Sequence, residues 1–314
     1  MITIGITIGD PSGIGPEVVI KALNSPAIKR LANYLVIGDK FVLSKASKKI
    51  LPRNVKFIDM ANVNRKGFSF GKVKAEYGAA SMDYINFALG LLKKGIIDCL
   101  VTAPISKESA NLGGYKITGH TEYLAKKTNS KNFEMMLLAK NLRTLTVTRH
   151  LPLKDISRKL KTKDIYQAIA LIYDALKKYF LIKKPKVAVC ALNPHLGEHG
   201  LLGQEERTRI APAVNKAKKR FGSVFGPVAS DAVFRDCLRG KYDAIVTMYH
   251  DQSLITLKTL FPNQAVNLTI GLPFVRTSPC HGTAFDIAGR NLADPTSMIE
   301  AIKLADRLAR NIKK

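Results

Sequence analysis

Residues 244–252 read Ala-Ile-Val-Thr-Met-Tyr-His-Asp-Gln, an apolar run that leads directly into His250. Short runs of β-branched and apolar residues with little polar alternation are typical of strands buried on both faces of a sheet. His150 and His195 each follow a similar run. We therefore expect each imidazole to emerge at the carboxyl end of a buried strand, which is the edge where open α/β sheets bind ligands.

Three imidazoles at one edge could hold a single divalent metal ion and leave coordination positions open for a substrate. The alternative interpretation is that each histidine is a separate, hydrogen-bonded polar group at a strand end. All three share their context beside Pro, Gly or Asp, which favours the metal site. Asp231 lies in a loop-like run, Gly-Pro-Val-Ala-Ser-Asp, where its carboxylate would cap a helix or orient a metal ligand.

Strand-like and helix-like segments alternate along the chain, which predicts a layered α/β protein with a mostly parallel sheet. The expected strands cover residues 2–9, 34–38, 98–103, 134–139, 143–148, 186–192, 243–249 and 265–270. The expected helices cover residues 16–24, 81–94, 163–180, 204–220 and 295–312. No low-complexity linker separates these elements, so any second domain is entered through short crossovers.

The composition suits a globular protein, because 46% of the 314 residues are hydrophobic. No apolar stretch approaches the roughly 18 residues that a membrane-spanning helix needs. The N-terminus shows no basic leader and no small-residue cleavage site, so we expect a cytoplasmic protein that does not bind membranes. The four cysteines are far apart, which favours thiols in a reducing compartment over disulfides.

The net charge of +26 would suit a nucleic-acid-binding protein, or an enzyme that attracts small anions. The basic residues are scattered over predicted helical faces, and neither a disordered basic tail nor an aromatic-studded basic stripe accompanies them. We therefore expect solvated basic surfaces, with a secondary benefit for anionic ligands and no nucleic-acid partner.

The first turn, residues 9–17, reads Gly-Asp-Pro-Ser-Gly-Ile-Gly-Pro-Glu and lies between a predicted strand and a predicted helix. Glycines at such a turn let backbone N–H groups approach a phosphate. The turn is not a dinucleotide fingerprint, because Val18 stands where the third glycine of GxGxxG belongs. The sequence is compatible with two interpretations of these residues, a structural turn and a phosphate-binding loop.

Polar and charged residues suited to anions occur further along the chain. His120 and Thr121 follow a glycine-rich turn and would open a helix, where they could grip an anion or cap the helix. Lys258, Asn267 and Arg276 carry groups that bind carboxylate or phosphate. Arg276 is the strongest candidate because it follows the apolar run Leu-Pro-Phe-Val.

Five motifs occur in order along nearly the whole chain. They are residues 9–17, Gly119-His120-Thr121-Glu122, Asn193-Pro194-His195-x-Gly197-Glu198, Tyr249-His250-Asp251-Gln252, and the run from Gly271-Leu272-Pro273 through Arg276-Thr277-Ser278 to His281-Gly282-Thr283-Ala284. Together they closely resemble the 4-hydroxythreonine-4-phosphate dehydrogenase family of pyridoxal phosphate biosynthesis. One departure is Cys280, which stands where the family usually carries Asp.

The resemblance implies two α/β/α domains with mostly parallel sheets, similar to isocitrate and isopropylmalate dehydrogenases, and an active site in the interdomain cleft. The first domain would be discontinuous, with residues 1–118 and 285–314. The second, residues 119–284, would carry most of the metal and substrate residues. The resemblance also implies a homodimer in which one metal site draws ligands from both subunits.

The implied reaction is an NAD- or NADP-dependent, metal-assisted oxidation of 4-phosphooxy-L-threonine, which is 4-hydroxythreonine 4-phosphate. The β-keto acid product would decarboxylate to 3-amino-2-oxopropyl phosphate. Carried over position by position, the metal ligands would be His150, His195 and His250. The substrate ligands would be His120, Thr121, Lys258, Asn267 and Arg276.

Several points stay open from the sequence. Three imidazoles suit zinc or cobalt, whereas magnesium or manganese would fit if substrate oxygens dominate the coordination. Asp231 and a water chain are both candidates for the general base. A related phosphorylated or dihydroxy acid is an alternative substrate. More distant alternatives are a metal-dependent hydrolase, in which the histidines activate water, and a nucleic-acid-binding protein.

Overall fold

The structure, a computed structural model, describes residues 1–313, and the contacts divide the chain into two units. Unit 1 comprises residues 1–131 together with the chain from 266 onward, and unit 2 comprises residues 132–265. Each unit layers helices on a mostly parallel sheet, so the predicted α/β class with a mostly parallel sheet is confirmed.

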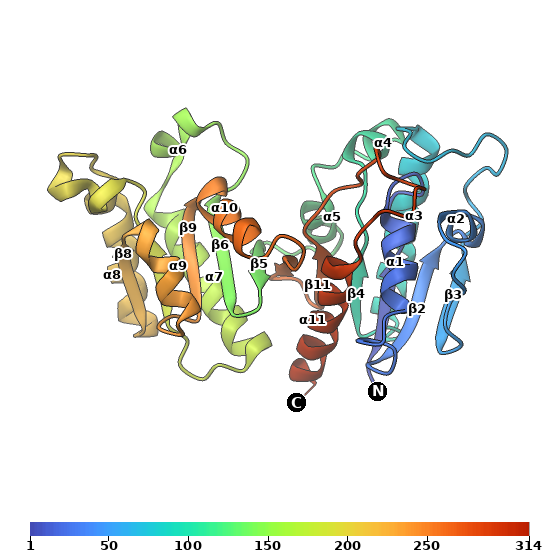
Figure 1. Ribbon diagram of the computed structural model, residues 1–314. Helices are drawn as coiled ribbons and strands as arrows, with labels where there is room; N and C mark the ends of the chain where they lie inside the picture. Colours follow the sequence, from blue (N-terminus) through green and yellow to red (C-terminus); the bar gives the residue numbers. More distant parts are fainter. Residues whose placement is uncertain (314) are drawn as a thin grey trace. The chain divides into compact units, whose positions relative to one another are not determined.

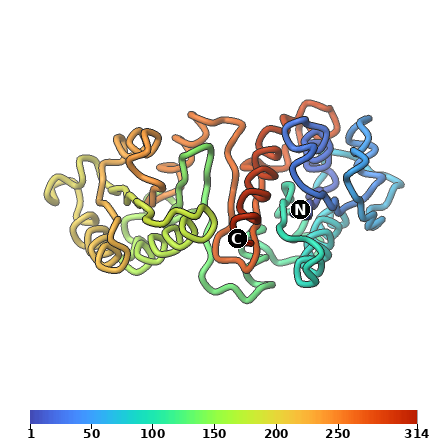
Figure 2. The backbone as a smooth tube through the Cα atoms, turned by 90° about the horizontal axis from the view of Figure 1, so that it is seen from below, coloured from blue at the N-terminus to red at the C-terminus, as the bar shows by residue number. Residues whose placement is uncertain are grey.

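Unit 1 places its strands in the order β3-β2-β1-β4-β11-β10. All neighbours in this row are parallel except β10 and β11, which are antiparallel. Helices α1 and α11 lie on one face of the sheet and α3 lies on the other (Figures 1 and 2). The elements are β1 (Thr3–Thr7), α1 (Gly15–Leu23), β2 (Asn33–Gly38), α2 (Lys40–Ala46), β3 (Val55–Asp59), α3 (Ala75–Lys93), β4 (Cys99–Thr102), α4 (Lys107–Leu112), α5 (His120–Lys127), β10 (Val266–Ile270), β11 (Val275–Pro279) and α11 (Thr296–Ile312).

Unit 2 places its strands in the order β5-β6-β9-β7-β8. Strands β6, β9, β7 and β8 are parallel, and β5 is antiparallel to β6. Helix α9 lies in front of this sheet and α7 lies behind it in Figure 1. The elements are β5 (Glu134–Ala139), β6 (Leu142–Thr148), α6 (Leu153–Lys159), α7 (Thr162–Phe180), β7 (Val187–Cys190), the turns η1 (Pro194–Gly200) and η2 (Glu206–Ile210), α8 (Ala211–Phe221), β8 (Val224–Val228), α9 (Ser230–Leu238), β9 (Ala244–Tyr249) and α10 (His250–Leu260).

All of the expected strands are present, and β3, β8 and β11 are additional. The expected helix at 204–220 is a π-helical turn followed by α8, and several short helices were not expected. The prediction that Asp231 lies in a loop is wrong, because Asp231 stands in the first turn of α9. An acidic residue after Ser230 suits that position, since a helix N-terminus favours negative charge.

The boundary between the units differs from the division expected at 118/119 and 284/285. Residues 119–131 and 266–284 belong to unit 1. The reason is strand pairing, because β11 is parallel to β4 with Val275 opposite Cys99 and β10 pairs with β11. Four of the five predicted substrate ligands therefore lie in unit 1, namely His120, Thr121, Asn267 and Arg276. The three predicted metal ligands lie in unit 2.

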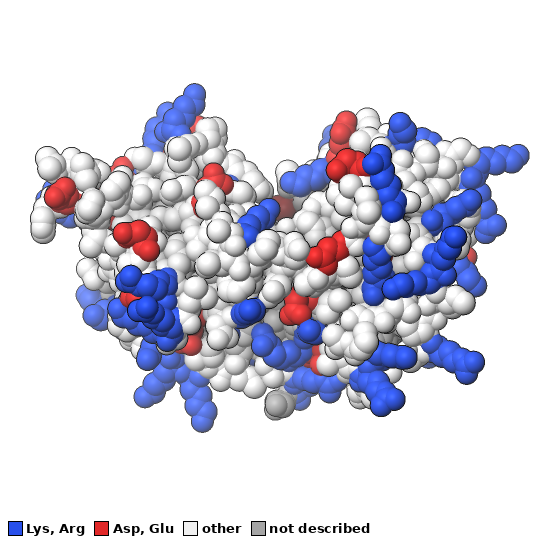
Figure 3. All heavy atoms as spheres, viewed as in Figure 1, with Lys and Arg blue, Asp and Glu red and all other residues white. Residues whose placement is uncertain are grey.

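Lysine and arginine side chains are dispersed over the visible surface of both units, and they do not form a single stripe in this view (Figure 3). Within residues 1–313, no helix is long and apolar enough to cross a membrane.

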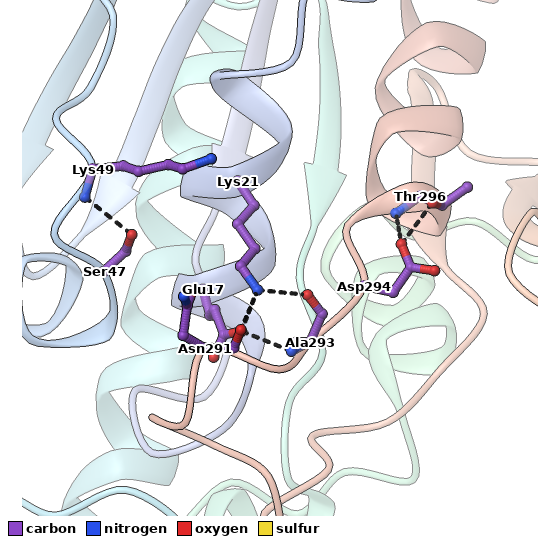
Figure 4. Close-up of polar contacts among 8 residues, drawn as sticks. All are labelled: Glu17, Lys21, Ser47, Lys49, Asn291, Ala293, Asp294 and Thr296. Atoms are coloured by element: carbon purple, nitrogen blue, oxygen red, sulfur yellow. Dashed lines mark hydrogen bonds and ion pairs between the residues drawn. The ribbon is translucent and has the colours of Figure 1, made fainter.

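A buried carboxylate fastens the C-terminal part of unit 1 to its N-terminal helix. Glu17 on α1 is 1% exposed, and its Oε1 accepts hydrogen bonds from Lys21 Nζ at 2.8 Å and from the Ala293 N–H at 2.7 Å. Lys21 Nζ also donates to the carbonyls of Asn291 and Ala293, each at 2.9 Å (Figure 4). This network explains how residues beyond 265 complete a unit that begins at the N-terminus.

We expect Glu17→Ala to lower the free energy of unfolding by about 3 kcal/mol, because it leaves a partly buried ammonium and a buried N–H without their acceptor. Urea-induced unfolding followed by circular dichroism measures this. The matched control is Glu300→Ala, which breaks an ion pair with Lys303 whose side chains are 37% and 40% exposed. It should cost less than about 1 kcal/mol. Equal losses in the two variants would contradict the fastening role of Glu17.

Candidate active site

The three strand-end histidines lie on neighbouring parallel strands of unit 2. Strand β9 is paired with β6 on one side and with β7 on the other, so the carboxyl ends of all three meet at one edge. His150 follows β6, His195 follows β7, and His250 is the first residue of α10 directly after β9. The predicted placement just past a strand is confirmed for His150 and His250, whereas His195 lies beyond the end of β7 at Cys190, inside the turn η1.

Two of these imidazoles are close to each other. The ring centroids of His150 and His250 are 6.1 Å apart, with an angle of 43° between the ring planes. His250 Nδ1 lies 2.6 Å from Asp251 Oδ1, and a carboxylate there favours the tautomer whose Nε2 carries the lone pair. The donor chemistry therefore fits an imidazole-bound divalent ion.

The segment that carries His195 has an unusual backbone. Residues 195–199 all have positive φ, between 42° and 76°, which is the left-handed region. Glu206, 5% exposed, fixes the start of this segment. Its Oε1 accepts from the N–H groups of Leu192 at 2.8 Å and Asn193 at 2.7 Å. His195 and Glu206 also line a cavity of about 450 Å³.

Within residues 1–313, no three His, Cys, Asp or Glu side chains lie close enough together to hold one metal ion. The convergence of all three histidines within a single chain is thus not seen. The shared site implied by the family resemblance stays a prediction.

A buried guanidinium forms a second cluster, in unit 1. Arg276 on β11 is 1% exposed, and its Nη1 donates to Thr269 Oγ1 at 3.0 Å while its Nη2 donates to Thr102 Oγ1 at 2.6 Å. Its Nε is buried and has no hydrogen-bond partner among the described residues. Burial lowers the pKa of Arg276 to about 9, so the group stays cationic at neutral pH. A desolvated cation held by hydroxyls is strongly disposed to bind an anion.

His120 and Thr121 join this cluster from the first turn of α5. Thr121 Oγ1 lies 3.4 Å from Thr269 Oγ1. The Nε2 atom of His120 is buried and has no hydrogen-bond partner within residues 1–313. Burial, followed by the positive charges of Arg276 and Lys107, holds the pKa of His120 well below its usual value. A neutral imidazole at this position can donate a hydrogen bond to an anion without adding charge.

The structure thus brings together His120, Thr121 and Arg276. It adds Thr102, whose hydroxyl stands at the end of the strand expected at 98–103, and Thr269, which sequence reasoning missed. The only signal for Thr269 is its register opposite Arg276 in the β10–β11 pair, and that register is visible only once the strands are paired. The remaining predicted residues lie elsewhere in their units. Asn267 lies opposite Ser278 in the same strand pair, Lys258 is exposed in the last turn of α10, and Asp231 is exposed on α9.

The first turn is a structural junction. The N–H of Asp10 donates to the Pro104 carbonyl at 2.9 Å, and the N–H of Ile14 donates to the Thr283 carbonyl at 2.9 Å. The N–H groups of Ser12 and Gly13 donate to Asp10 itself, at 2.9 and 3.1 Å. With these donors engaged, the structural interpretation of residues 9–17 is favoured over a phosphate loop.

The fold and these clusters are those of an α/β dehydrogenase. Residues 24–305 match the sequence profile of the pyridoxal phosphate biosynthetic protein PdxA. A 4-hydroxythreonine-4-phosphate dehydrogenase of Sulfurihydrogenibium sp. is 41% identical, with 99% of each chain covered. A protein of Oceanobacillus iheyensis provisionally named D-threonate 4-phosphate dehydrogenase is 39% identical, with 98% of this chain and 97% of the relative covered.

Solved structures agree with this assignment. The crystal structure of 4-hydroxythreonine-4-phosphate dehydrogenase from Klebsiella pneumoniae is 36% identical and has a TM-score of 0.89, with 98% of this chain and 100% of that chain covered. A β-decarboxylating dehydrogenase of Thermococcus kodakarensis, 13% identical with a TM-score of 0.51, shares the fold alone. The chain belongs to the PdxA family, and it is a dehydrogenase.

The carboxyl of Asp10 in the first turn should make the stability of the protein depend on pH. Its side chain is fully buried, and burial raises the pKa of its carboxyl to about 6, against the hydrogen bond from the Ser12 N–H. The folded state therefore holds this proton more tightly than the unfolded state. The resulting stabilisation is complete below about pH 4 and is lost as the pH rises through about 6.

Between about pH 4 and pH 7.5, wild-type protein should lose about 2–3 kcal/mol of stability relative to Asp10→Asn, in which the group cannot ionise. Denaturant unfolding at a series of pH values measures the difference. The same substitution at Asp174, exposed on α7, is the control. Parallel stability curves for wild type and Asp10→Asn would contradict the raised pKa.

Proposed function

We propose that the protein oxidises 4-phosphooxy-L-threonine with NAD or NADP, and that the β-keto acid formed loses carbon dioxide to give 3-amino-2-oxopropyl phosphate. Membership of the PdxA family and the names of its full-length relatives support this substrate. A cytoplasmic homodimer is part of the proposal, and the absence of disulfides among the four cysteines suits a reducing compartment.

The observation that carries the proposal is the buried, cationic Arg276. Its hydrogen-bond partners are the hydroxyls of Thr102 and Thr269, and the negative charge of Glu122 raises its pKa less than burial lowers it. A substrate that bears both a phosphate and a carboxylate supplies the missing negative charge. His120 and Thr121 add a neutral donor and a hydroxyl beside it.

In the proposed mechanism, Arg276 and Lys258 hold the phosphate and carboxylate ends, and His120, Thr121 and Asn267 orient the substrate between them. The secondary hydroxyl loses its proton to a base, with Asp231 or a water chain as the candidates, and its carbon transfers a hydride to NAD or NADP. The carbon–carboxylate bond then breaks. Carbon dioxide leaves, and the resulting enolate takes up a proton on carbon.

His150, His195 and His250 would hold a divalent ion, with His250 contributed by the partner subunit. Such an ion, when bound, polarises the hydroxyl and carbonyl oxygens and stabilises the enolate. Imidazole donors favour zinc or cobalt, whereas magnesium or manganese requires more oxygen ligands from the substrate.

A second substrate, D-threonate 4-phosphate, is favoured by the 39% identity to the relative from Oceanobacillus iheyensis. It carries a hydroxyl where 4-phosphooxy-L-threonine carries an amine. The same phosphate and carboxylate contacts would serve both acids, so the group at that one carbon decides between them.

The test is an absorbance assay of reduced nicotinamide with each acid, using NAD and NADP in parallel. We expect turnover of 4-phosphooxy-L-threonine with release of carbon dioxide, loss of activity on chelation, and recovery with added zinc or cobalt. Exclusive turnover of D-threonate 4-phosphate would replace the substrate. No hydride transfer to either cofactor, or full activity in protein shown to be metal-free, would contradict the proposal.

Removal of a single anion-binding charge should affect the substrate alone. Lys258→Ala and Arg276→Ala should each raise the substrate KM by about 10- to 150-fold, the equivalent of about 1.5–3 kcal/mol for a charge-assisted contact. The cofactor KM should stay within about twofold. Lys154→Ala, at an exposed position of α6, is the control. A larger rise in the cofactor KM would assign these residues to the nicotinamide cofactor.

A further inference from the structure

The guanidinium of Arg276 lies between side chains of the two strands that flank its own. Strand β11 has β4 on one side and β10 on the other. Arg276 stands opposite Thr269 on β10 and opposite Leu100 on β4, and Leu100 precedes Thr102 by two residues. Paired residues, and residues two apart along a strand, share a face of the sheet, so Arg276, Thr102 and Thr269 lie on the same face. Strand register therefore places a threonine on each side of the cation.

Each of the two threonines accepts a hydrogen bond from a different nitrogen of Arg276. Thr102 Oγ1 accepts from Nη2 at 2.6 Å, and Thr269 Oγ1 accepts from Nη1 at 3.0 Å. Both threonines are 0% exposed, and a β-branched side chain has few χ1 rotamers, so neither acceptor can follow a guanidinium that rotates. Because the guanidinium is planar, one contact at each terminal nitrogen fixes its orientation.

The same two hydroxyls also favour the charged form of Arg276. Burial lowers the pKa of Arg276 to about 9, and the negative charge of Glu122 opposes this shift. Hydrogen bonds that are made to the charged form of a group stabilise that form. A hydroxyl is a neutral acceptor, so it stabilises the guanidinium without cancelling the positive charge that attracts an anion.

Two further polar atoms of this cluster have no hydrogen-bond partner within residues 1–313. They are Nε of Arg276 and Nε2 of His120, and both are buried. Thr121 follows His120 in α5, and its hydroxyl oxygen lies 3.4 Å from that of Thr269. A phosphate group suits this set, because it offers three strong acceptor oxygens to the guanidinium, the imidazole and the hydroxyl. The Nε atom can meet such an oxygen in a constant geometry only if the rest of the guanidinium is held, as Thr102 and Thr269 hold it.

We propose that Thr102 and Thr269 are positioning residues for the phosphate of the substrate, and that they act by orienting the guanidinium of Arg276 toward it. The two hydroxyls act through Arg276, and no contact between them and the substrate is needed. This inference rests on the proposed function, because the substrate-binding role of Arg276 is itself a proposal. The experiment below separates failure of the one from failure of the other.

The affinity of the full-length protein for inorganic phosphate is measured by isothermal titration calorimetry. Thr102→Val and Thr269→Val keep the shape of the side chain and remove its hydroxyl. Each should weaken phosphate binding by about 5- to 30-fold, a factor between those typical of a neutral and of a charge-assisted hydrogen bond. Thr102→Ser and Thr269→Ser retain the hydroxyl and should bind phosphate within about threefold of wild type.

The dehydrogenase assay gives a second measurement on the same variants. In Thr102→Val and Thr269→Val the substrate KM should rise by a factor similar to the loss of phosphate affinity. The kcat should change by less than about threefold, because a binding contact is weakened and the reacting groups are untouched. The cofactor KM should stay within about twofold.

Thr277→Val is the matched control. Thr277 is the next residue of β11 after Arg276 and is also 0% exposed, but it lies on the other face of the sheet, where its hydroxyl donates to the Ala301 carbonyl of α11 at 2.8 Å. Its loss should lower the melting temperature and leave phosphate affinity as in wild type. Lower melting temperatures for Thr102→Val and Thr269→Val with unchanged phosphate affinity would show a purely structural role and overturn the proposal.

Arg276→Ala tests the anion site itself. If it binds phosphate as tightly as wild type, Arg276 is not the anion-binding residue and the positioning role falls with it. If it loses phosphate while both valine variants retain wild-type affinity, the anion site stands and only the positioning role is overturned. If phosphate binding depends on Arg276 and on both hydroxyls but no hydride transfer is seen, the positioning role stands and the proposed reaction is wrong.

Discussion

Parallel pairing of β6, β9 and β7 is the constraint on which the candidate chemistry depends. Parallel strands end at the same edge, so any residue type placed just past each of them is brought to that edge. Here the residue is a histidine each time. The backbone groups that the strands leave unpaired at this edge are taken up by side chains of the neighbouring turns, with Glu206 and Gln252 the main contributors. The same geometry therefore brings the three histidines to one edge of the sheet, and it leaves backbone groups there that polar side chains satisfy.

In unit 1 the candidate site depends on the guanidinium of Arg276, which is buried and whose positive charge is still available to a ligand. A carboxylate partner would neutralise Arg276 and compete with a substrate. The hydroxyls of Thr102 and Thr269 satisfy two of its donors without neutralising it, and burial leaves its charge poorly solvated. His120 stays neutral beside it because the same burial and the same positive charge disfavour its protonation. The buried positive charge of Arg276 and the neutral hydrogen-bonding groups beside it suit an anion, in agreement with the phosphorylated substrate that we propose.

Much of this arrangement could be predicted from the sequence, because buried strands and the residues just past them carry a strong local signal. The strands before His150, His195 and His250 are examples. Strand β11 carries no such signal, since Val-Arg-Thr-Ser-Pro is polar and contains a proline, yet its pairing with β4 decides that Arg276 belongs to unit 1. The contacts of Thr269 and Gln252 depend on strand register and on the meeting of segments far apart in the chain. Local pattern therefore could not reveal them.

The most direct test of the shared histidine site is subunit complementation. Two inactive variants, His150→Ala and His250→Ala, are allowed to exchange subunits, and native mass spectrometry verifies the mixed dimers. If His250 completes the site formed by His150 and His195 of the other chain, each mixed dimer has one intact site. About a quarter of wild-type activity should then return after random exchange. Mixing His150→Ala with His195→Ala should restore nothing, because both residues belong to the same chain's share of the site. Absence of recovery in the first mixture, with mixed dimers present, would contradict the account.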